Sequence, residues 1–487
     1  MKRIVSPSDM KAWDQSCISN GISSLELMIR AASGIKDEIL SIRGDRFVTC
    51  LCGSGNNGGD GIALAWLLKK DDVPVRIILL AEENRLTSDS VYYLNLAKEE
   101  KVPVFKEWDP VPDEIIVDAI FGIGLNREVT GSYAKLINDL NSSGKIVISA
   151  DIPSGLHALT GSVLGTAVKA TITVTMQFIK SGMLLNQGPS FSGNIRICTL
   201  SDHSEYIFEN EMFLQEDGDI VPLLPPRPFD SHKGKNGHAL LCVGSPRYTG
   251  AALLSSRSCL RAGCGILSVC TPDQVRPFFR SLPEAITIPI GSEDWNHDSC
   301  ATAVKAFSDK SAIGIGCGLG SGDTRLLLSE AIKSKIPLVI DADGLNALSK
   351  NRDLIPLLHQ NIIITPHLGE MARLLNCKVQ DVAENPLKAV SSFSCTVLLK
   401  GPTTLVSDGL KTVFCTEGSP ALAKGGSGDV LTGIITALLA QGLSAFDAAR
   451  TGTYILGTTA KNAMKLLSER MLLASDIIDL LEQETYE

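Results

Sequence analysis

A run of nine residues in the first quarter of the chain combines glycines with polar side chains that could do chemistry. It occupies positions 53–61 and reads Gly-Ser-Gly-Asn-Asn-Gly-Gly-Asp-Gly. The run contains the Gly-x-Gly-x-x-Gly pattern of dinucleotide-binding turns, in which backbone amides hold a pyrophosphate. Pyrophosphate binding does not require Asn56, Asn57 or Asp60, and the carboxylate of Asp60 would repel a pyrophosphate. Two amides and an acid suit a cation, or the hydroxyls of a sugar or a carboxamide.

Two further aspartates stand beside glycine-rich loops. Asp118 precedes the loop Phe-Gly-Ile-Gly-Leu-Asn, and Asp151 opens the sequence Asp-Ile-Pro-Ser-Gly. Each follows or ends an apolar run, and the carboxyl ends of parallel strands line one crevice. Any one aspartate is about as easily explained as a helix cap or a turn former. Three of them at equivalent strand ends, Asp60 included, favour one shared site.

A second candidate site lies near the carboxyl end of the chain. Residues 423–435 read Ala-Lys-Gly-Gly-Ser-Gly-Asp-Val-Leu-Thr-Gly-Ile-Ile, a loop of small residues that leads into an apolar helix. Free amides at 426–428 and the helix dipole would hold an anion, with Asp429 beside them as a base. A plain helix start with Asp429 as a favourable first-turn acid is the alternative. Four small residues in a row favour close approach to a ligand.

Three other loops of the second half follow predicted strands. They span residues 340–346, 365–370 and 399–404. His367 alone would more often be structural, and Lys400 alone would more often be a solvated lysine. Their positions in loops, beside glycine and proline, favour a functional role for both.

Strands that alternate with helices must position these loops. The predicted strands, short apolar and β-branched runs, are 46–52, 75–80, 115–120, 146–150, 239–243, 313–315, 338–340, 362–365 and 396–399. In the first half, segments with helical periodicity at 61–70, 88–100 and 133–141 separate them. This alternation predicts an α/β fold with parallel sheets that helices cover on both faces.

The 487 residues exceed the commonest domain size about threefold, which favours two domains. Residues 201–230 interrupt the alternation with a polar, acidic and then proline-rich stretch, typical of a linker. We therefore expect two α/β domains, at 1–215 and 225–487. No internal repeat relates them.

Composition excludes several function classes. The chain has 45 basic and 54 acidic residues, and its formal charge of −9 gives no indication of the basic surface that nucleic acids bind. The 13 cysteines lack the paired spacing of zinc ligands, and Cys50 and Cys52 are expected to be core residues of a reducing compartment. No segment approaches the ~18 to 20 apolar residues of a membrane span, and the amino terminus does not resemble a signal peptide. We expect a cytoplasmic protein that binds neither nucleic acid nor membranes.

The three motifs of the first half, together with Val-Thr-Gly at 129–131, resemble the NAD(P)H-hydrate epimerase family from residue 6 to about residue 200. The resemblance implies a Rossmann-like three-layer domain that interconverts the R and S forms of the hydrated cofactors NADHX and NADPHX. It implies a potassium ion on Asn57, Asp118 and Ser154. The residues that it implies for hydrate binding are Asn56, Asn57, Gly58, Gly59, Asp60, Gly122, Ile123, Gly124, Leu125, Asn126, Arg127, Glu128 and Asp151.

Inversion of a carbon that bears a hydroxyl beside a ring nitrogen needs a group that protonates the departing hydroxyl and guides water to the other face. Asp151 is the candidate for that catalytic role. Many relatives have Met-Glu where this chain has Met28-Ile29.

The motifs of the second half resemble the ADP/ATP-dependent NAD(P)H-hydrate dehydratase family, which has a ribokinase-like α/β fold, from about residue 227 to about residue 481. The resemblance implies Asp429 as catalytic base, and Gly320, His367 and Asp429 as contacts of the hydrate. It implies nucleotide contacts from Lys400, Gly401, Pro402, Thr403, Thr404 and Gly428. One departure is Cys317, where relatives commonly have proline.

The implied chemistry is a kinase step that ends in elimination, with Mg²⁺ and either ADP or ATP. Asp429 deprotonates the hydrate hydroxyl, a phosphoryl group transfers to it, and the ring nitrogen expels phosphate. Two alternatives stay open: a vitamin kinase of the ribokinase-like group, which leaves the first domain unexplained, and a non-enzymatic cofactor-sensing or RNA-associated role for the first half. The expected partners are NADHX, NADPHX, ADP and ATP, and further copies of the chain in a homo-oligomer.

Overall fold

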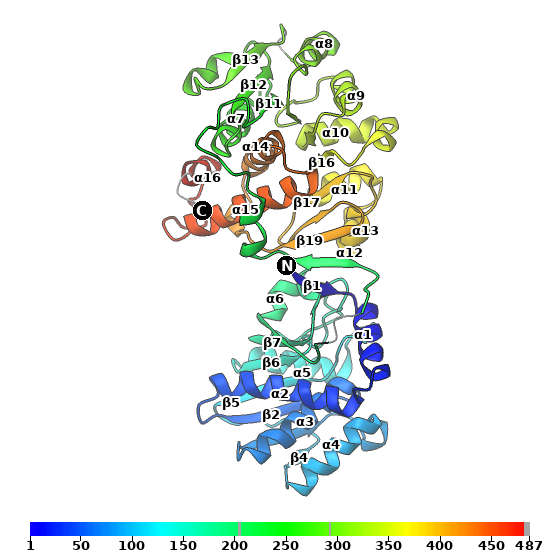
Figure 1. Cartoon of the computed structure of the whole chain (residues 1–487). Coiled ribbons are helices and arrows are strands. Elements are labelled where there is room, and N and C mark those ends of the chain that lie inside the picture. Colours follow the sequence, from blue (N-terminus) through cyan, green and yellow to red (C-terminus); the bar gives the residue numbers. More distant parts are fainter. Residues whose placement is uncertain (203–205, 292–293, 482–487) are drawn as a thin grey trace. The chain divides into compact units, whose positions relative to one another are not determined.

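The chain divides into two compact units, each an α/β structure (Figure 1). The computed structural model describes residues 1–202, 206–291 and 294–481. The first unit spans Lys2–Glu211, and the second spans Met212–Glu487 together with Met1. The α/β class expected from the sequence is confirmed, with mainly parallel sheets in both units.

A seven-stranded parallel sheet forms the centre of the first unit. Its strand order is β4-β3-β2-β5-β6-β7-β9. The strands are β2 (Phe47–Cys52), β3 (Val75–Leu79), β4 (Val104–Phe105), β5 (Glu114–Ala119), β6 (Ile146–Ala150), β7 (Ile172–Met176) and β9 (Asn194–Cys198). From β2 the chain first builds β3 and β4 on one side, then returns to place β5 on the other. This reversal opens a crevice at the carboxyl ends of β2 and β5, where open α/β sheets bind ligands.

Side-chain alternation along the strands produces the three layers. Val48, Cys50 and Cys52 of β2 belong to a core with helices on one face, whereas Leu51 belongs to a smaller core on the other face. The first face carries α1 (Pro7–Ser19), α2 (Ser24–Ile42), α3 (Asn56–Lys70) and α4 (Ser88–Glu99). The second carries α5 (Gly131–Ser142).

Smaller elements complete the first unit. They are β1 (Lys2–Val5), which pairs in parallel with β8 (Ile179–Lys180), and the short helix α6 (Gly188–Ser192). Cys50 and Cys52 are fully buried, as expected, and burial raises the pKa of both thiols.

The second unit has a sheet of mixed direction in the order β13-β12-β11-β14-β15-β16-β17-β18-β19. The strands are β11 (His238–Cys242), β12 (Ile266–Thr271), β13 (Ile286–Pro289), β14 (Ala312–Ile315), β15 (Leu338–Ile340), β16 (Ile362–Ile364), β17 (Thr396–Leu399), β18 (Thr404–Ser407) and β19 (Lys411–Cys415). All neighbours pair in parallel except β17 with β18 and β18 with β19. The strand order again reverses beside the first strand, between β11 and β14.

Ten helices of this unit are described. They are α7 (Thr249–Arg261), α8 (His297–Lys305), α9 (Arg325–Ser334), α10 (Ala342–Lys350), α11 (Leu368–Leu375), α12 (Val379–Glu384), α13 (Pro386–Val390), α14 (Ser427–Ala440), α15 (Ala445–Ala463) and α16 (Ala474–Leu480). Helix α14 is apolar on all sides and is buried along nearly its whole length, as a helix at the centre of a core should be. It therefore holds the Gly-Gly-Ser-Gly-Asp loop against the sheet.

Part of the segment expected to be a linker, from residue 211 to residue 223, is structured; residues 203–205 lie outside the described residues. The strand β10 (Glu211–Leu214) lies beside β19, and the backbone N–H of Gln215 donates to the carbonyl of Phe414 at 3.1 Å. Two 3-10 turns follow, η3 (Asp217–Asp219) and η4 (Val221–Leu223), and Ile220 between them is fully buried. Proline and acid content alone did not reveal this packing.

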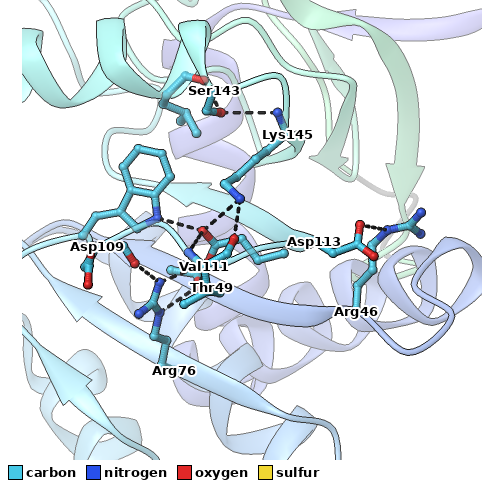
Figure 2. A network of polar contacts seen from close by, with 11 residues as sticks. Arg46, Thr49, Arg76, Asp109, Val111, Asp113, Ser143 and Lys145 are labelled. Atoms are coloured by element: carbon cyan, nitrogen blue, oxygen red, sulfur yellow. Dashed lines mark hydrogen bonds and ion pairs between the residues drawn. The ribbon is translucent and has the colours of Figure 1, made fainter.

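A buried charge network lies at the amino end of β5 (Figure 2). Glu114 is almost fully buried and forms ion pairs with Arg76 at 3.1 Å and with Lys145 at 3.4 Å. It also accepts hydrogen bonds from Thr49, Trp108 and the backbone of Val111. One carboxylate thus joins β2, β3, β5 and the start of β6 at the end of the sheet opposite the crevice.

Within the described residues, no helix is both long enough and apolar enough to cross a membrane.

Candidate functional sites

A cavity of about 660 Å³ lies at the crevice of the first unit. Its walls come from α1, α2, the start of α3, and the loops that follow β2, β5 and β6. The residues of its wall that the sequence predicted are Asn56, Asn57, Asp60, Gly122, Ile123, Gly124, Leu125, Asn126, Arg127 and Asp151. The topological reversal thus brings together motifs that lie almost a hundred residues apart.

Three residues of the predicted hydrate set do not line this cavity: Gly58, Gly59 and Glu128. The two glycines are buried in α3, where a Cβ on Gly58 would lie 2.1 Å from the carbonyl oxygen of Gly53. A Cβ on Gly59 would lie 2.5 Å from the Cε of Met28. Their role in this structure is to let α3 pack closely at the floor of the site.

Asp151 forms an ion pair with Lys180, whose side chain is fully buried. The backbone N–H of Met176 donates to the same carboxylate at 3.0 Å. Asp151 has a φ of +64°, a conformation that costs energy for a residue other than glycine and is typical of functional sites. In both contacts the carboxylate of Asp151 is a hydrogen-bond acceptor. The role expected for Asp151 combined protonation of the departing hydroxyl with guidance of water, and acceptor contacts of this kind suit the guidance of water.

Two more carboxyl groups of the cavity, those of Asp14 and Asp60, have raised pKa values. Burial, followed by the negative charge of Asp151, raises the pKa of Asp14 to about 6, and Lys180 opposes the rise. Burial, with Asp151 and Asp14, raises the pKa of Asp60 well above its usual value. Asp14 was missed by the sequence analysis because α1 carries no glycine-rich motif beside it.

Asp118 lies beneath the cavity and is completely buried. It accepts hydrogen bonds from the hydroxyl of Ser149 at 2.8 Å, the backbone N–H of Ser154 at 2.9 Å and the hydroxyl of Ser154. Burial raises the pKa of this carboxyl group, although the bonds from Ser154 and Ser149 oppose the rise. None of the described lysines or arginines forms an ion pair with it.

Asn57 reaches the same place from α3. Its Nδ2 donates to the carbonyl of Phe121 at 3.1 Å, and the backbone N–H of Phe121 donates to the hydroxyl of Ser154 at 2.8 Å. The Oδ1 of Asn57 is buried and has no hydrogen-bond partner among the described residues. Asn57, Asp118 and Ser154, the predicted potassium ligands, are therefore adjacent, with one acceptor oxygen unused.

The second site lies at the start of α14. The first helical residue is Ser427, and Gly426 is the N-cap with a φ of +98°. Asp429 is thus the third residue of the helix, not its cap. Burial raises its pKa to about 6; a hydrogen bond from Cys317 opposes this, and Asp341 adds to it. The buried hydroxyl of Ser427, in the same turn, has no partner among the described residues.

Lys400 and Asp341 form an ion pair beside this helix start. The Nζ of Lys400 lies 2.8 Å from Oδ1 of Asp341, and the hydroxyl of Thr432 donates to Oδ2 at 2.8 Å. Burial, the largest single effect, would raise the pKa of Asp341, but the charge of Lys400 together with hydrogen bonds from Lys400, Thr365 and Thr432 outweighs it and holds the pKa below its usual value. A Cβ on Gly428 would lie 3.6 Å from the Nζ of Lys400. Predicted nucleotide residues from two distant motifs, Lys400 and Gly428, therefore meet here.

His367 and Gly320 lie on neighbouring loops. His367 caps α11, accepting from the backbone N–H of Gly369 at 3.0 Å through Nδ1, and its Nε2 lies 3.6 Å from Glu370. Lys400 lies 3.9 Å from the same Glu370. The backbone N–H of Gly320 donates to Asp343 at 2.8 Å.

The remaining predicted nucleotide residues form a turn between two strands. Gly401 and Pro402 are exposed and Thr403 is half-buried, whereas Thr404 begins β18 and pairs with Cys415. The hairpin of β18 and β19 was not among the predicted strands.

Cys317 lies in a glycine-rich turn and contacts the predicted base Asp429. It is fully buried, and its thiol forms hydrogen bonds with Asp429 and with Thr432. Burial, with the charges of Asp429 and Asp341, raises the pKa of this thiol well above its usual value. The thiol is therefore a neutral group in contact with the predicted base.

Comparisons with known proteins agree over nearly the whole chain. A bifunctional NAD(P)H-hydrate repair enzyme of Coxiella burnetii is 33% identical over 96% of this chain and 96% of its own. One from Vibrio cholerae is 36% identical over 86% of this chain and 85% of its own. The chain belongs to the family of bifunctional NAD(P)H-hydrate repair enzymes.

The two parts of this repair-enzyme family match separate units. The model of the YjeF-related protein N-terminus covers residues 24–182, and the NAD(P)H-hydrate dehydratase model covers residues 239–483. The chain is therefore an NAD(P)H-repair enzyme with epimerase and dehydratase domains, and the family predicted from the motifs is confirmed.

A solved structure supports the fold of the second part of the repair enzyme. An ADP/ATP-dependent NAD(P)H-hydrate dehydratase from Bacillus subtilis, co-crystallised with ATP and Mg²⁺, has a TM-score of 0.50 and 28% identity. The match covers 56% of this chain and 98% of that chain.

Proposed function

We propose that the first unit interconverts the R and S forms of NADHX and NADPHX, and that the second dehydrates the S form with ADP or ATP. The observation that carries the dehydratase assignment is the place of Asp429. It is a carboxyl group of raised pKa in the first turn of α14, directly after the glycine-rich loop and close to the Lys400 ammonium. A base beside an anion site is what phosphoryl transfer to a hydroxyl requires.

In the proposed dehydration, Asp429 takes the proton from the hydroxyl of the hydrate. The hydroxyl oxygen then bonds to the terminal phosphorus of the nucleotide, and the nucleotide leaves one phosphoryl group shorter. Lys400 and the amides at 426–428 stabilise the charge on the phosphoryl oxygens. Phosphate leaves from the ring carbon as the ring nitrogen supplies electrons, and loss of a proton from the adjacent carbon restores the double bond.

A Mg²⁺ ion fits this site. Asp341 and Asp343 follow β15, and carboxylates with phosphate oxygens are the ligands that Mg²⁺ prefers. When bound, it neutralises charge on the phosphates. The likeness to the Bacillus subtilis dehydratase, whose crystals were grown with ATP and Mg²⁺, supports the same requirement here.

A potassium ion fits the site beneath the epimerase cavity. The three predicted ligands all offer oxygen atoms: the unpartnered Oδ1 of Asn57, the hydroxyl of Ser154 and the carboxylate of Asp118, which has no cationic partner among the described residues. A bound cation would supply the positive countercharge for this buried carboxylate and would hold the loop after β5 in position.

For the epimerase we propose that the hydrate occupies the 660 Å³ cavity, bounded by Asn56, Asp60 and the loop 122–127. Asp151, paired with Lys180, orients the water that attacks the ring carbon. We also place the enzyme in the cytoplasm, in keeping with its 13 free cysteines. The homo-oligomer expected from the sequence stays a prediction, which light scattering would test.

The test uses the full chain and a mixture of the R and S epimers of NADHX. Wild type with ATP and Mg²⁺ should consume both epimers, and without nucleotide it should only interconvert them. Asp429→Asn should keep interconversion and lose dehydration, whereas Asp151→Asn should consume the S form alone. Accumulation of a stable phosphorylated product would contradict the proposal and indicate a kinase.

A further inference from the structure

Four aspartates line the epimerase cavity, and three of them, from three elements, interact electrostatically with one another: Asp14, Asp60 and Asp151. Asp14 comes from α1, Asp60 from α3 and Asp151 from the loop after β6. Lys180 pairs with Asp151, and Lys11, on the same helix as Asp14, is exposed. Of these three acids, only Asp151 has a cationic partner at ion-pair distance among the described residues, and that difference can assign their roles.

Asp151 is fixed as an acceptor. Besides Asp151, the ammonium of Lys180 donates to Thr175 Oγ1 at 3.0 Å and to the carbonyl of Met176 at 2.9 Å. An ammonium has three protons, so all of them have partners. Neither member of this pair offers a free proton to a leaving hydroxyl.

Asp14 and Asp60 lack such support. Neither carboxyl group has a hydrogen bond or an ion pair with any of the described residues. An anion without donors in a partly buried cavity is destabilised, which raises the pKa of both groups. Each can therefore donate a proton, which Asp151 cannot.

We propose that Asp14 is a catalytic residue of the epimerase site, where its carboxyl group gives a proton to the departing hydroxyl of the hydrate. The proposal rests on the proposed epimerase activity and deepens it. No sequence motif marks Asp14. Its place on α1, which contributes to the cavity wall, is what brings it to the hydrate.

The step balances as follows. The proton of Asp14 adds to the hydroxyl oxygen, the bond from that oxygen to the ring carbon breaks, and water leaves. The lone pair of the ring nitrogen forms a double bond to the carbon. A second water attacks that carbon from the other face and passes a proton to Asp151. Proton exchange with solvent through the open cavity then restores both carboxyl groups.

The choice of Asp14 over Asp60 follows from proton affinity. A proton donor works best when its pKa lies near the working pH. The pKa of Asp14 is about 6, whereas Asp60 is more deeply buried and its pKa lies well above its usual value. The titratable or charged groups that line the cavity with Asp14 or interact with it are Lys11 and Cys17 on its own helix, and Asp60, Asp89, Arg127, Asp151 and Lys180 on other elements.

The test measures interconversion of purified R- and S-NADHX by the full chain, without nucleotide, from pH 5 to pH 8. Because the acid form of Asp14 is required, wild-type kcat should fall as pH rises above the pKa of that group. Asp14→Asn should lower kcat by about 10² to 10⁴, the effect of losing a positioned acid, and should abolish this pH dependence. Asp14→Glu should restore most of the rate and the pH dependence. Asp139→Asn, which removes an exposed acid of α5, should behave as wild type.

Several outcomes would overturn the proposal. One is a pH dependence that persists in Asp14→Asn and disappears in Asp60→Asn, which would assign the proton to Asp60. Another is an Asp14→Asn variant with wild-type kcat, or one that is merely slower at every pH while Asp14→Glu is not rescued. If wild type itself fails to interconvert the epimers, the proposed function fails and not this assignment alone.

Discussion

The Nζ of Lys400 lies 2.8 Å from Oδ1 of Asp341, although 59 positions separate the two residues in the chain. Both stand beside Asp429, and they act on it in opposite directions. Asp341 raises the pKa of Asp429 and Lys400 lowers it. The ion pair therefore adjusts the proton affinity of the proposed base.

The first prediction uses this opposition. Dehydration needs ionised Asp429, so wild-type kcat should rise with pH through about 6. Asp341→Asn removes a negative charge and leaves Lys400 with only the more distant Glu370 as an anionic partner, so it should shift this rise to lower pH. Lys400→Gln should shift it to higher pH. The measurement is kcat against pH at saturating nucleotide and S-NADHX; shifts in the same direction for both variants would contradict the electrostatic account.

The second prediction concerns Asp429→Asn. Because Gly426 is the N-cap, the substitution removes only a first-turn charge, worth about 0.3 to 1 kcal/mol of folding stability at most. Dehydration should nevertheless fall by about 10² to 10⁴, as for loss of a general base. Urea unfolding and single-turnover dehydration are the measurements. Near-normal turnover with ATP would make Asp429 a structural residue.

The third prediction concerns potassium. Asp118→Asn removes the only charge among the three proposed ligands, so the concentration of K⁺ needed for half-maximal epimerisation should rise at least about tenfold, a loss of about 1.4 kcal/mol. Dehydration of S-NADHX should not change, because it uses the other unit. Titration of K⁺ against epimerisation at constant ionic strength checks this. Ser149→Ala is the matched control, since it removes a hydrogen bond to Asp118 and leaves the charge.

The fourth prediction concerns the network in Figure 2. Glu114→Ala leaves Arg76 and Lys145 without their shared anion and should cost about 3 to 5 kcal/mol of folding stability. Replacing all three by leucine should recover much of this loss, because no buried charge is then left unpaired. Thermal unfolding of the first unit is the measurement.

The same variants carry an activity control. Glu114 begins β5, and the cavity lies past the other end of that strand, roughly 20 Å away at about 3.3 Å per residue. The KM for NADHX should therefore stay unchanged at temperatures where the protein is folded. A changed KM with unchanged stability would mean that the network acts on the site.

The sequence by itself determined the α/β class, the family and the loops that carry the two sites. Crossover helices between the apolar runs make successive strands run in the same direction. The glycine-rich turns that follow these strands therefore meet at one edge of the sheet. The strand predictions were good where a run was apolar throughout, as at 115–120 and 146–150. They missed the β18 and β19 hairpin, the buried strands β7 and β12, and the packed segment around Ile220, where short apolar stretches are mixed with polar residues or proline.

Only the tertiary structure decided which acids have a cationic partner. Lys180 neutralises Asp151 from 29 positions away, and Lys400 does the same for Asp341. Asp14 lies on a helix without any motif, and its proton affinity depends on its burial and on Asp151. A carboxyl group's charge state is set by desolvation and by neighbouring charges within a few ångströms. Those neighbours come from distant parts of the chain, so local sequence can name an acid but cannot tell whether it gives or takes a proton.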